Sequence, residues 1–115
     1  MVNAEYKVGK SNKNLCPVKE SLNILGGKWA LAIIYSLLNG KKRFKELERS
    51  IEGINTRMLV KELKLLEKNK ILTRTAFATI PPTVEYELTE KGQKIKPVLQ
   101  ELYNWGNLYN PDFKV

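Results

Sequence analysis

Hydrophobic residues recur with a helical period along most of the chain, and they alternate only over residues 71–89. In Arg43–Ile51, apolar side chains at i, i+3 and i+7 form a single stripe, which predicts a helix. The stretch 52–54 then interrupts the pattern, and Gly53 supplies the backbone freedom that a sharp turn needs. A second helix follows, which Asn55 or Thr56 can cap.

The second helix, about Asn55–Asn69, has two different faces. At about 100° per residue, its leucines fall together on one side and its basic residues fall on the opposite side. We therefore expect the leucine side to face a core and the basic side to face outward. The apolar set is Leu59, Leu63 and Leu66, and the basic set is Arg57, Lys61, Lys64 and Lys68. Two helices joined by a short glycine-containing turn are typical of a helix-turn-helix, although a helical hairpin with a solvated lysine face remains the alternative.

Two more helices are predicted before this pair. Val18–Leu25 is short, with Pro17 suited to its first turn, and Gly26-Gly27 ends it. Lys28–Leu38 is apolar on nearly every side and is predicted to be buried. The basic residues 41–43 lie at the start of the helix-turn-helix, where a positive charge is a poor partner for the helix dipole. They would be better placed beside DNA phosphates. The alternative is a solvated loop.

The alternating region predicts a β-hairpin. Its strands are Ile71–Phe77 and Thr83–Thr89, and Pro81-Pro82 breaks the run between them. A hairpin directly after a recognition helix is a wing. A last helix is expected over Glu90–Asn107, with Thr89 as its cap and with Pro97 either kinking it or marking where its straight part begins.

This order predicts a mainly α fold with a small β-hairpin (α+β), a winged helix-turn-helix that dimerises through its N- and C-terminal helices. We expect an N-terminal arm over residues 1–15, a domain over 16–109 and a tail over 110–115. The last helix is more apolar than is needed to cover a small domain, so we favour a subunit interface over packing on its own core. The predicted interface residues are Leu22, Val98, Leu99, Leu102, Trp105 and Tyr109.

Composition narrows the function. The chain of 115 residues carries a net charge of +8, which is typical of a nucleic-acid-binding domain. It contains no histidine and one cysteine, so we expect no metal, no cofactor and no enzymatic activity. The longest apolar run, Trp29–Leu38, is too short to span a bilayer, and residues 1–13 lack the apolar stretch of a signal peptide. We therefore expect a cytoplasmic protein without a membrane partner.

Several short motifs, in their order and spacing, resemble the HxlR family of bacterial winged helix-turn-helix regulators, which is related in fold to the MarR group. The resemblance extends from Cys16 to Gly106. It is carried by Cys16-Pro17-Val18, Gly26-Gly27-Lys28-Trp29, Arg43-Phe44, Glu46-Leu47, Gly53-Ile54, Arg57-Met58-Leu59, Leu63, Leu66-Glu67, Pro81-Pro82, Val84-Glu85-Tyr86, Leu88-Thr89, Gly92, Pro97-Val98-Leu99 and Trp105-Gly106.

The resemblance implies a homodimer with intertwined terminal helices, whose two recognition helices enter successive major grooves of a palindromic operator. It places Arg43, Asn55, Thr56, Arg57 and Lys61 in segments that contact DNA. The chain departs from the family at Thr83, where many relatives carry a basic residue. Arg74 is then the hairpin's only cation.

Some members of this family sense oxidants through a cysteine at the position of Cys16. The residue lies at a predicted helix N-terminus, where free N–H groups stabilise a thiolate, and Lys13 and Lys19 are near it in sequence. Its place between an arm and an interface helix leads us to expect exposure. The alternative is an inert, buried apolar residue.

The functional hypothesis is a dimeric transcriptional regulator that binds double-stranded operator DNA, with Cys16 as a candidate redox or electrophile sensor. An oxidant or small-molecule inducer is expected but not identified. The alternative is a winged-helix module that binds an acidic protein partner or RNA. The candidate DNA-binding residues are Arg43, Asn55, Thr56, Arg57, Lys61, Lys64 and Arg74.

Overall fold

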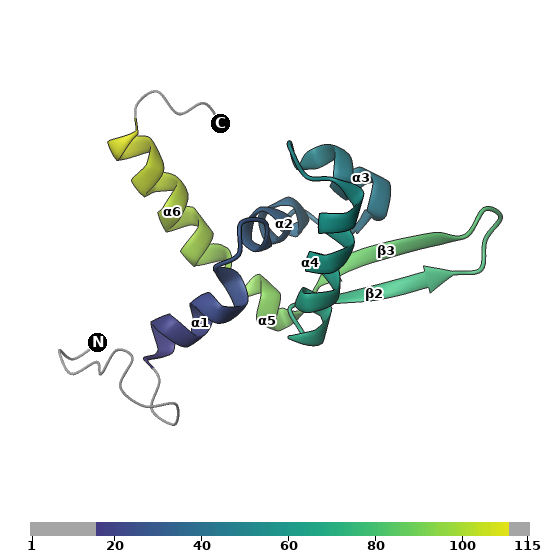
Figure 1. Cartoon of the computed structure of the whole chain (residues 1–115), viewed down its shortest axis with the longest axis horizontal. Helices are drawn as coiled ribbons and strands as arrows, with labels where there is room; N and C mark the ends of the chain where they lie inside the picture. Colours follow the sequence, from purple (N-terminus) through teal and green to yellow (C-terminus); the bar gives the residue numbers. More distant parts are fainter. Residues whose placement is uncertain (1–15, 111–115) are drawn as a thin grey trace.

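The computed structural model describes residues 16–110 and confirms a winged helix-turn-helix made of helices and one small antiparallel sheet (Figure 1). The predicted arm, the end of the predicted tail and Lys13 lie outside the described residues. The elements are, in chain order, α1 (Pro17–Leu25), α2 (Ala30–Leu37), β1 (Lys42–Arg43), α3 (Phe44–Ser50), α4 (Thr56–Lys68), β2 (Leu72–Phe77), β3 (Thr83–Leu88), α5 (Glu90–Gln93) and α6 (Lys96–Tyr109).

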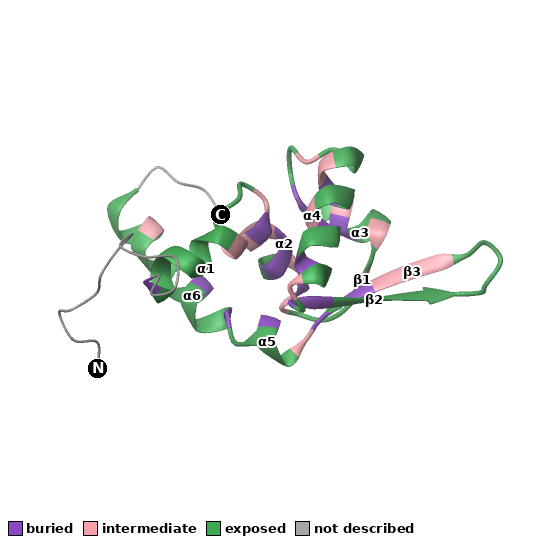
Figure 2. Ribbon diagram, turned by 60° about the horizontal axis from the view of Figure 1, so that its bottom comes forward, coloured by how far each residue is buried: buried purple, intermediate pink, exposed green. Residues whose placement is uncertain are grey.

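The core forms around α2. Ile33, Ile34 and Leu37 of this helix are almost completely buried, and the leucine stripe of α4 packs into the same cluster. Buried residues therefore gather on α2 and on the inward side of α4, whereas α1, α6 and the outer part of the hairpin are mostly exposed (Figure 2). Burial of these apolar side chains is the main favourable contribution to the fold.

The sheet has the order β1-β3-β2 in the described part of the chain. Strands β2 and β3 form the predicted hairpin, with Arg74 opposite Tyr86 and Phe77 opposite Thr83. Strand β1 was not predicted, because its two residues are too few to show alternation. It places Lys42 opposite Tyr86 and Arg43 opposite Glu85, and so attaches the start of α3 to the hairpin.

The turn between α3 and α4 has the conformation that the sequence predicts. Gly53 has a φ of 90°, in the region that favours glycine. Helix α4 then begins at Asn55, whose side-chain oxygen accepts a hydrogen bond from the N–H of Met58 at 2.9 Å. Of the two proposed caps, Asn55 is therefore the one used.

The predicted final helix is two helices in the structure. Helix α5 begins at Thr89, whose hydroxyl accepts from the N–H of Gly92 at 3.1 Å, so the predicted cap is correct. The helix is interrupted after α5. Pro97 lies in the first turn of α6, where its missing N–H costs nothing. Pro97 thus marks where the straight helix begins. A Cβ at Gly92 would lie 2.3 Å from the carbonyl oxygen of Ile71, so this close approach requires glycine.

The two terminal helices lie away from the hairpin. Both views place α1 and α6 at one end of the molecule and the β2–β3 turn at the other (Figures 1 and 2). Within residues 16–110, none of the helices combines the length and the hydrophobicity required to span a membrane. The same residues contain no group of three or more His, Cys, Asp or Glu side chains that could hold a metal ion.

Candidate nucleic-acid interface

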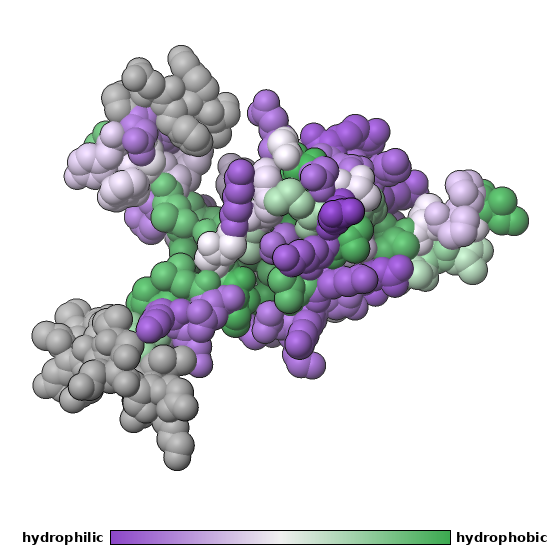
Figure 3. Space-filling model, in the orientation of Figure 1, coloured by the Kyte–Doolittle hydropathy of each residue, from purple (hydrophilic) through white to green (hydrophobic). Residues whose placement is uncertain are grey.

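Helix α4 presents a cationic stripe directly opposite its buried leucines. Leu59, Leu63 and Leu66 are almost fully buried, which fixes the rotation of the helix about its axis. The basic residues on the other side are all exposed: Arg57, Lys61, Lys64 and Lys68. Figure 3 shows hydrophilic residues gathered over α3 and α4. The separation of the two faces that the sequence predicts is therefore present in the structure.

Two of the candidate DNA-binding residues also hold α4 in place. The oxygen of the Asn55 side chain caps the helix, and the hydroxyl of Thr56 donates to Glu48 Oε2 at 2.5 Å. The second contact ties the start of α4 to α3. Both side chains are nevertheless exposed, so the amide nitrogen of Asn55 and the lone pairs of the Thr56 hydroxyl remain available at this end of the helix.

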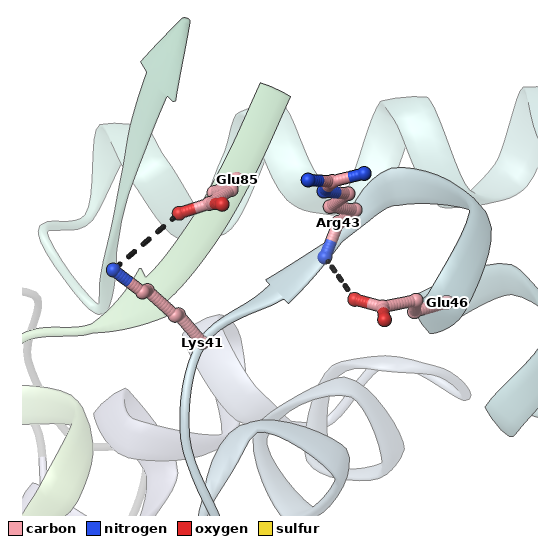
Figure 4. Close-up of polar contacts among 4 residues, drawn as sticks. All are labelled: Lys41, Arg43, Glu46 and Glu85. Carbon is pink, nitrogen blue, oxygen red and sulfur yellow. Dashed lines mark hydrogen bonds and ion pairs between the residues drawn. The ribbon is translucent and has the colours of Figure 1, made fainter. Parts of the chain in front are cut away.

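The basic residues before α3 divide into different roles. Lys41 Nζ lies 3.6 Å from Glu85 Oε1, and Lys42 Nζ donates to the carbonyl oxygen of Ser36 at 2.8 Å (Figure 4 shows the first pair). The backbone N–H of Arg43 donates to Glu46 Oε1 at 2.8 Å. Lys41 and Lys42 thus each have one partner within the chain, and their placement beside phosphates stays a prediction.

Arg43 differs from its two neighbours. Its side chain is exposed, and among the described residues no hydrogen-bond or ion-pair partner is found for its guanidinium. The nearby Glu46 does not pair with the guanidinium. Its carboxylate accepts from the backbone N–H of Arg43 and so caps the start of α3.

A groove of about 460 Å³ separates α4 from the hairpin. Its apolar floor includes Phe44 and Val84, and its rim carries the cations Lys64 and Arg74 together with the acidic Glu67. The structure therefore brings two predicted DNA-binding residues, Lys64 and Arg74, to the same groove. Helical periodicity did not place Glu67 in this groove, because the residue lies off the basic stripe of α4.

A second exposed surface lies on α6 and α1. Leu102 and Trp105 are 50% and 60% exposed, and Leu22 on α1 is similarly exposed. The rings of Trp105 and Tyr109 pack against each other in a tilted arrangement, with centroids 5.4 Å apart and an interplanar angle of 48°. Leu99 differs from the other predicted interface residues. It is only 7% exposed and packs in the core of its own chain, so it is a core residue in this structure.

Cys16 is buried, whereas its place in the sequence led us to expect an exposed side chain. Its side chain is 4% accessible and has a free thiol. Its carbonyl oxygen accepts from the N–H of Glu20 at 2.9 Å, which makes Cys16 the residue that begins α1. Burial is common for a free cysteine, because its small side chain is apolar.

One exposed feature was not singled out by the sequence reasoning. The hairpin ends in the segment Ala78–Pro82, here called the wing tip, and Ile80 at its centre is 100% exposed. Figure 3 shows hydrophobic residues at this far end of the hairpin. The signal was present in the sequence, because no residue between 75 and 83 carries a charge.

Comparison with known proteins identifies the family of this chain. Residues 24–113 match the model of the HxlR-like helix-turn-helix family. The uncharacterized HTH-type transcriptional regulator YdeP of Bacillus subtilis is 42% identical over 94 residues, covering 82% of this chain and 73% of the relative. The matched family is a helix-turn-helix family, and this relative is a transcriptional regulator.

Solved structures agree in fold. A transcriptional regulator of the MarR family from Porphyromonas gingivalis is 36% identical and superposes with a TM-score of 0.81, covering 90% of this chain and 98% of its own. The redox regulator HypR, in its oxidized form, is 38% identical with a TM-score of 0.77, covering 87% of this chain and 100% of its own. This chain belongs to the HxlR-like helix-turn-helix family of transcriptional regulators.

Proposed function

We propose that this regulator binds a palindromic DNA operator as a homodimer and places α4 in the major groove. The observation that carries the proposal is the cationic stripe of α4, held outward by the burial of its leucines. An α-helix fits the major groove, where base edges differ for all four base pairs. Arg57 lies in the first turn of α4, so it is the best candidate for a base contact, whereas Lys64 and Lys68 are further along and would meet phosphates.

Pairing of two chains would use the exposed apolar face of α6, together with α1. A groove of about 880 Å³ runs along this face and is lined by Val98, Leu102, Trp105 and Leu108 among others. Large exposed apolar patches mark interaction sites. A twofold dimer presents two recognition helices to two half-sites, which is why a palindrome is the expected target.

The experiment is a gel shift with the protein's own upstream intergenic DNA, in the presence of excess random duplex. We expect a retarded band that the random duplex does not remove. The variant Lys61→Ala should weaken the band, while Lys94→Ala removes the same charge outside α3, α4 and the hairpin and should not. Binding without preference for any duplex would favour the interaction module that meets an acidic partner or RNA.

We also propose that Cys16 transmits an oxidant signal to DNA binding. HypR, to which this chain is similar, is a redox regulator. Cys16 begins α1, a helix that belongs to the surface proposed to pair the chains, so a change at its sulfur would act on that surface. Since the chain has no second cysteine, a disulfide at Cys16 can form only with another chain or with a small thiol.

This second proposal is tested with diamide, which is reduced to the hydrazine as two thiols lose two protons and two electrons to form a disulfide. The wild-type operator affinity should change on treatment, and dithiothreitol should restore it. Cys16→Ser should not respond. Because the thiol is buried, we expect the reaction to be slower than for an exposed thiol. An equal response of the two proteins, or no response of either, would make Cys16 a structural residue.

A further inference from the structure

We propose that the uncharged wing tip makes an apolar contact in the minor groove of DNA, with Ile80 as the contacting residue. The inference rests on the proposed DNA-binding function and adds a second element that reads the duplex. Its motivation is a mismatch: the hairpin projects from the DNA-binding end of the molecule, yet its end carries no charge (Figures 1 and 3). A phosphate contact from this segment would therefore lack a cation.

The base of the hairpin is fixed beside α4. Lys64 of α4 and Arg74 of β2 line the same groove, so one DNA strand that leaves the major groove at α4 would meet both cations. Glu67 also lines this groove, and its negative charge would repel a phosphate there. Lys64 and Arg74 are the residues that would attract one. The next surface along the duplex beyond this strand is the minor groove.

The hairpin is long enough to reach that groove. Its ladder continues from Arg74 to Phe77, three residue steps, which extends it by about 10 Å before the turn begins. The minor groove of B-DNA is about 6 Å wide. A hairpin with Arg74 at the phosphates thus carries the wing tip across the adjoining groove.

The wing tip is built to present an apolar side chain in one conformation. The Thr79 hydroxyl donates to the carbonyl oxygen of Pro81 at 2.7 Å and lies 3.3 Å from the Thr83 hydroxyl. Pro81 and Pro82 have fixed φ angles, which limits the freedom of the loop before binding. Ile80 stands fully exposed between Thr79 and these prolines. Ordering this loop on DNA would therefore cost little entropy.

An apolar tip suits the minor groove for a physical reason. Proteins that bind there insert Ile, Leu, Phe, Met or Pro side chains against the sugars and base steps. Such a contact releases no counterions, so its contribution does not depend on salt. Guanine adds an exocyclic amino group to the floor of the minor groove, and an apolar side chain cannot accept a hydrogen bond from it. We therefore expect a preference for A·T pairs, or for inosine–cytosine pairs, beneath the tip.

The test uses the operator fragment found by gel shift, and it compares wild type, Ile80→Ala and Ile80→Leu over a range of salt. Ile80→Ala should weaken binding about tenfold, because most of one apolar contact is lost, with the slope of log K against log salt unchanged. Ile80→Leu keeps the apolar volume and should bind within about twofold of wild type. Arg74→Ala is the contrasting variant and should reduce the slope by about 0.9.

A second arm changes only the minor groove. Replacing guanine by inosine in the pairs beneath the tip leaves the major-groove edge intact and removes the amino group. Wild type should prefer the inosine duplex several-fold, and Ile80→Ala should lose that preference. Thermal unfolding of Ile80→Ala should match wild type, since the side chain is fully exposed.

The outcomes separate the inference from the function on which it rests. If the wild type shows no operator preference, the proposed function fails. If the wild type binds specifically but Ile80→Ala binds equally well and keeps the same base preference, only the wing-tip contact is overturned, and a protein would then be the better partner for this segment.

Discussion

Helix α4 buries its leucine stripe in the core of its own chain, whereas helix α6 leaves most of its apolar side chains exposed. Leu59, Leu63 and Leu66 are at most 2% accessible, while Leu102 and Trp105 are at least half exposed. The exposed face of α4 is cationic and the exposed face of α6 is apolar. The difference indicates two kinds of partner, because a cationic face attracts an anionic polymer and an apolar face gains by excluding water.

Both faces also have a clear place in the molecule. The cationic stripe lies on α4, near the hairpin, whereas α6 lies toward the opposite end of the molecule (Figure 1). Under the proposed function, one end would bind DNA and the other would join two chains. The following predictions test this division, starting with the largest expected effect.

The first prediction compares two leucines of α4. Leu59→Ala should lower the free energy of unfolding by about 2–5 kcal/mol, because Leu59 is completely buried and its truncation leaves a cavity. Leu65→Ala is the matched control on the same helix, where the side chain is 45% exposed, and it should cost well under half as much. Urea unfolding at one fixed protein concentration measures both. Equal losses would mean that the leucine stripe does not anchor α4.

The second prediction concerns α6. Leu102→Asp should abolish pairing of the chains, since a charge on a desolvated apolar face costs several kcal/mol. Sedimentation equilibrium should show monomers, with the far-ultraviolet circular dichroism of the wild type, and operator affinity should fall with the loss of the dimer. Tyr35→Asp provides a control, because it places the same charge on α2 at another exposed apolar side chain. A folded Leu102→Asp dimer would place the interface elsewhere.

The outcome for α6 also shows where sequence reasoning ends. Leu99 and Leu102 lie on one apolar stripe, and the sequence treats them alike. In the structure α6 points away from the rest of the chain after α5, so Leu99, near its start, still packs into the core while Leu102 does not (Figure 1). The direction in which a helix leaves the domain is a tertiary property, and helical periodicity does not contain it.

The strongly periodic segments were the most predictable. The faces of α4 and the turn at Gly53 follow from local rules, and the structure agrees with both. Local rules also limited the cap of α4 to Asn55 or Thr56, and the structure uses Asn55. Strand β1 is too short for any pattern. Lys42 donates to the carbonyl of Ser36 in another element, and its sequence neighbours do not reveal this contact. Cys16 is buried, which was the alternative to the exposure that its place in the sequence favoured.

The third prediction addresses the direct reading of bases by α4. Arg57→Ala should reduce operator affinity by about 1–3 kcal/mol and relax the preference at one base position, as expected for a lost bidentate contact to guanine. Fluorescence anisotropy with the operator and with single-base variants measures both effects. Unchanged affinity together with unchanged base preference would mean that the orientation of α4 in the groove is wrong.

The fourth and smallest effect is expected at the far end of the same stripe. Lys68→Ala should weaken binding to operator and random duplex about equally, and should lower the salt slope by about 0.9. Lys94→Ala removes an equal charge outside this stripe and should leave the slope unchanged. A loss of base preference in Lys68→Ala would contradict the assignment of Lys68 to phosphates.

In the proposed complex, two chains joined through α6 place two copies of α4 in successive major grooves on one face of the duplex. This arrangement can be measured by dimethyl sulfate protection of guanine N7 on the operator, because N7 lies in the major groove. We expect two protected groups whose centres lie about 10–10.5 base pairs apart, both lost together in Leu102→Asp. A single protected group in the wild type, or protection that survives in a monomeric Leu102→Asp, would rule this arrangement out.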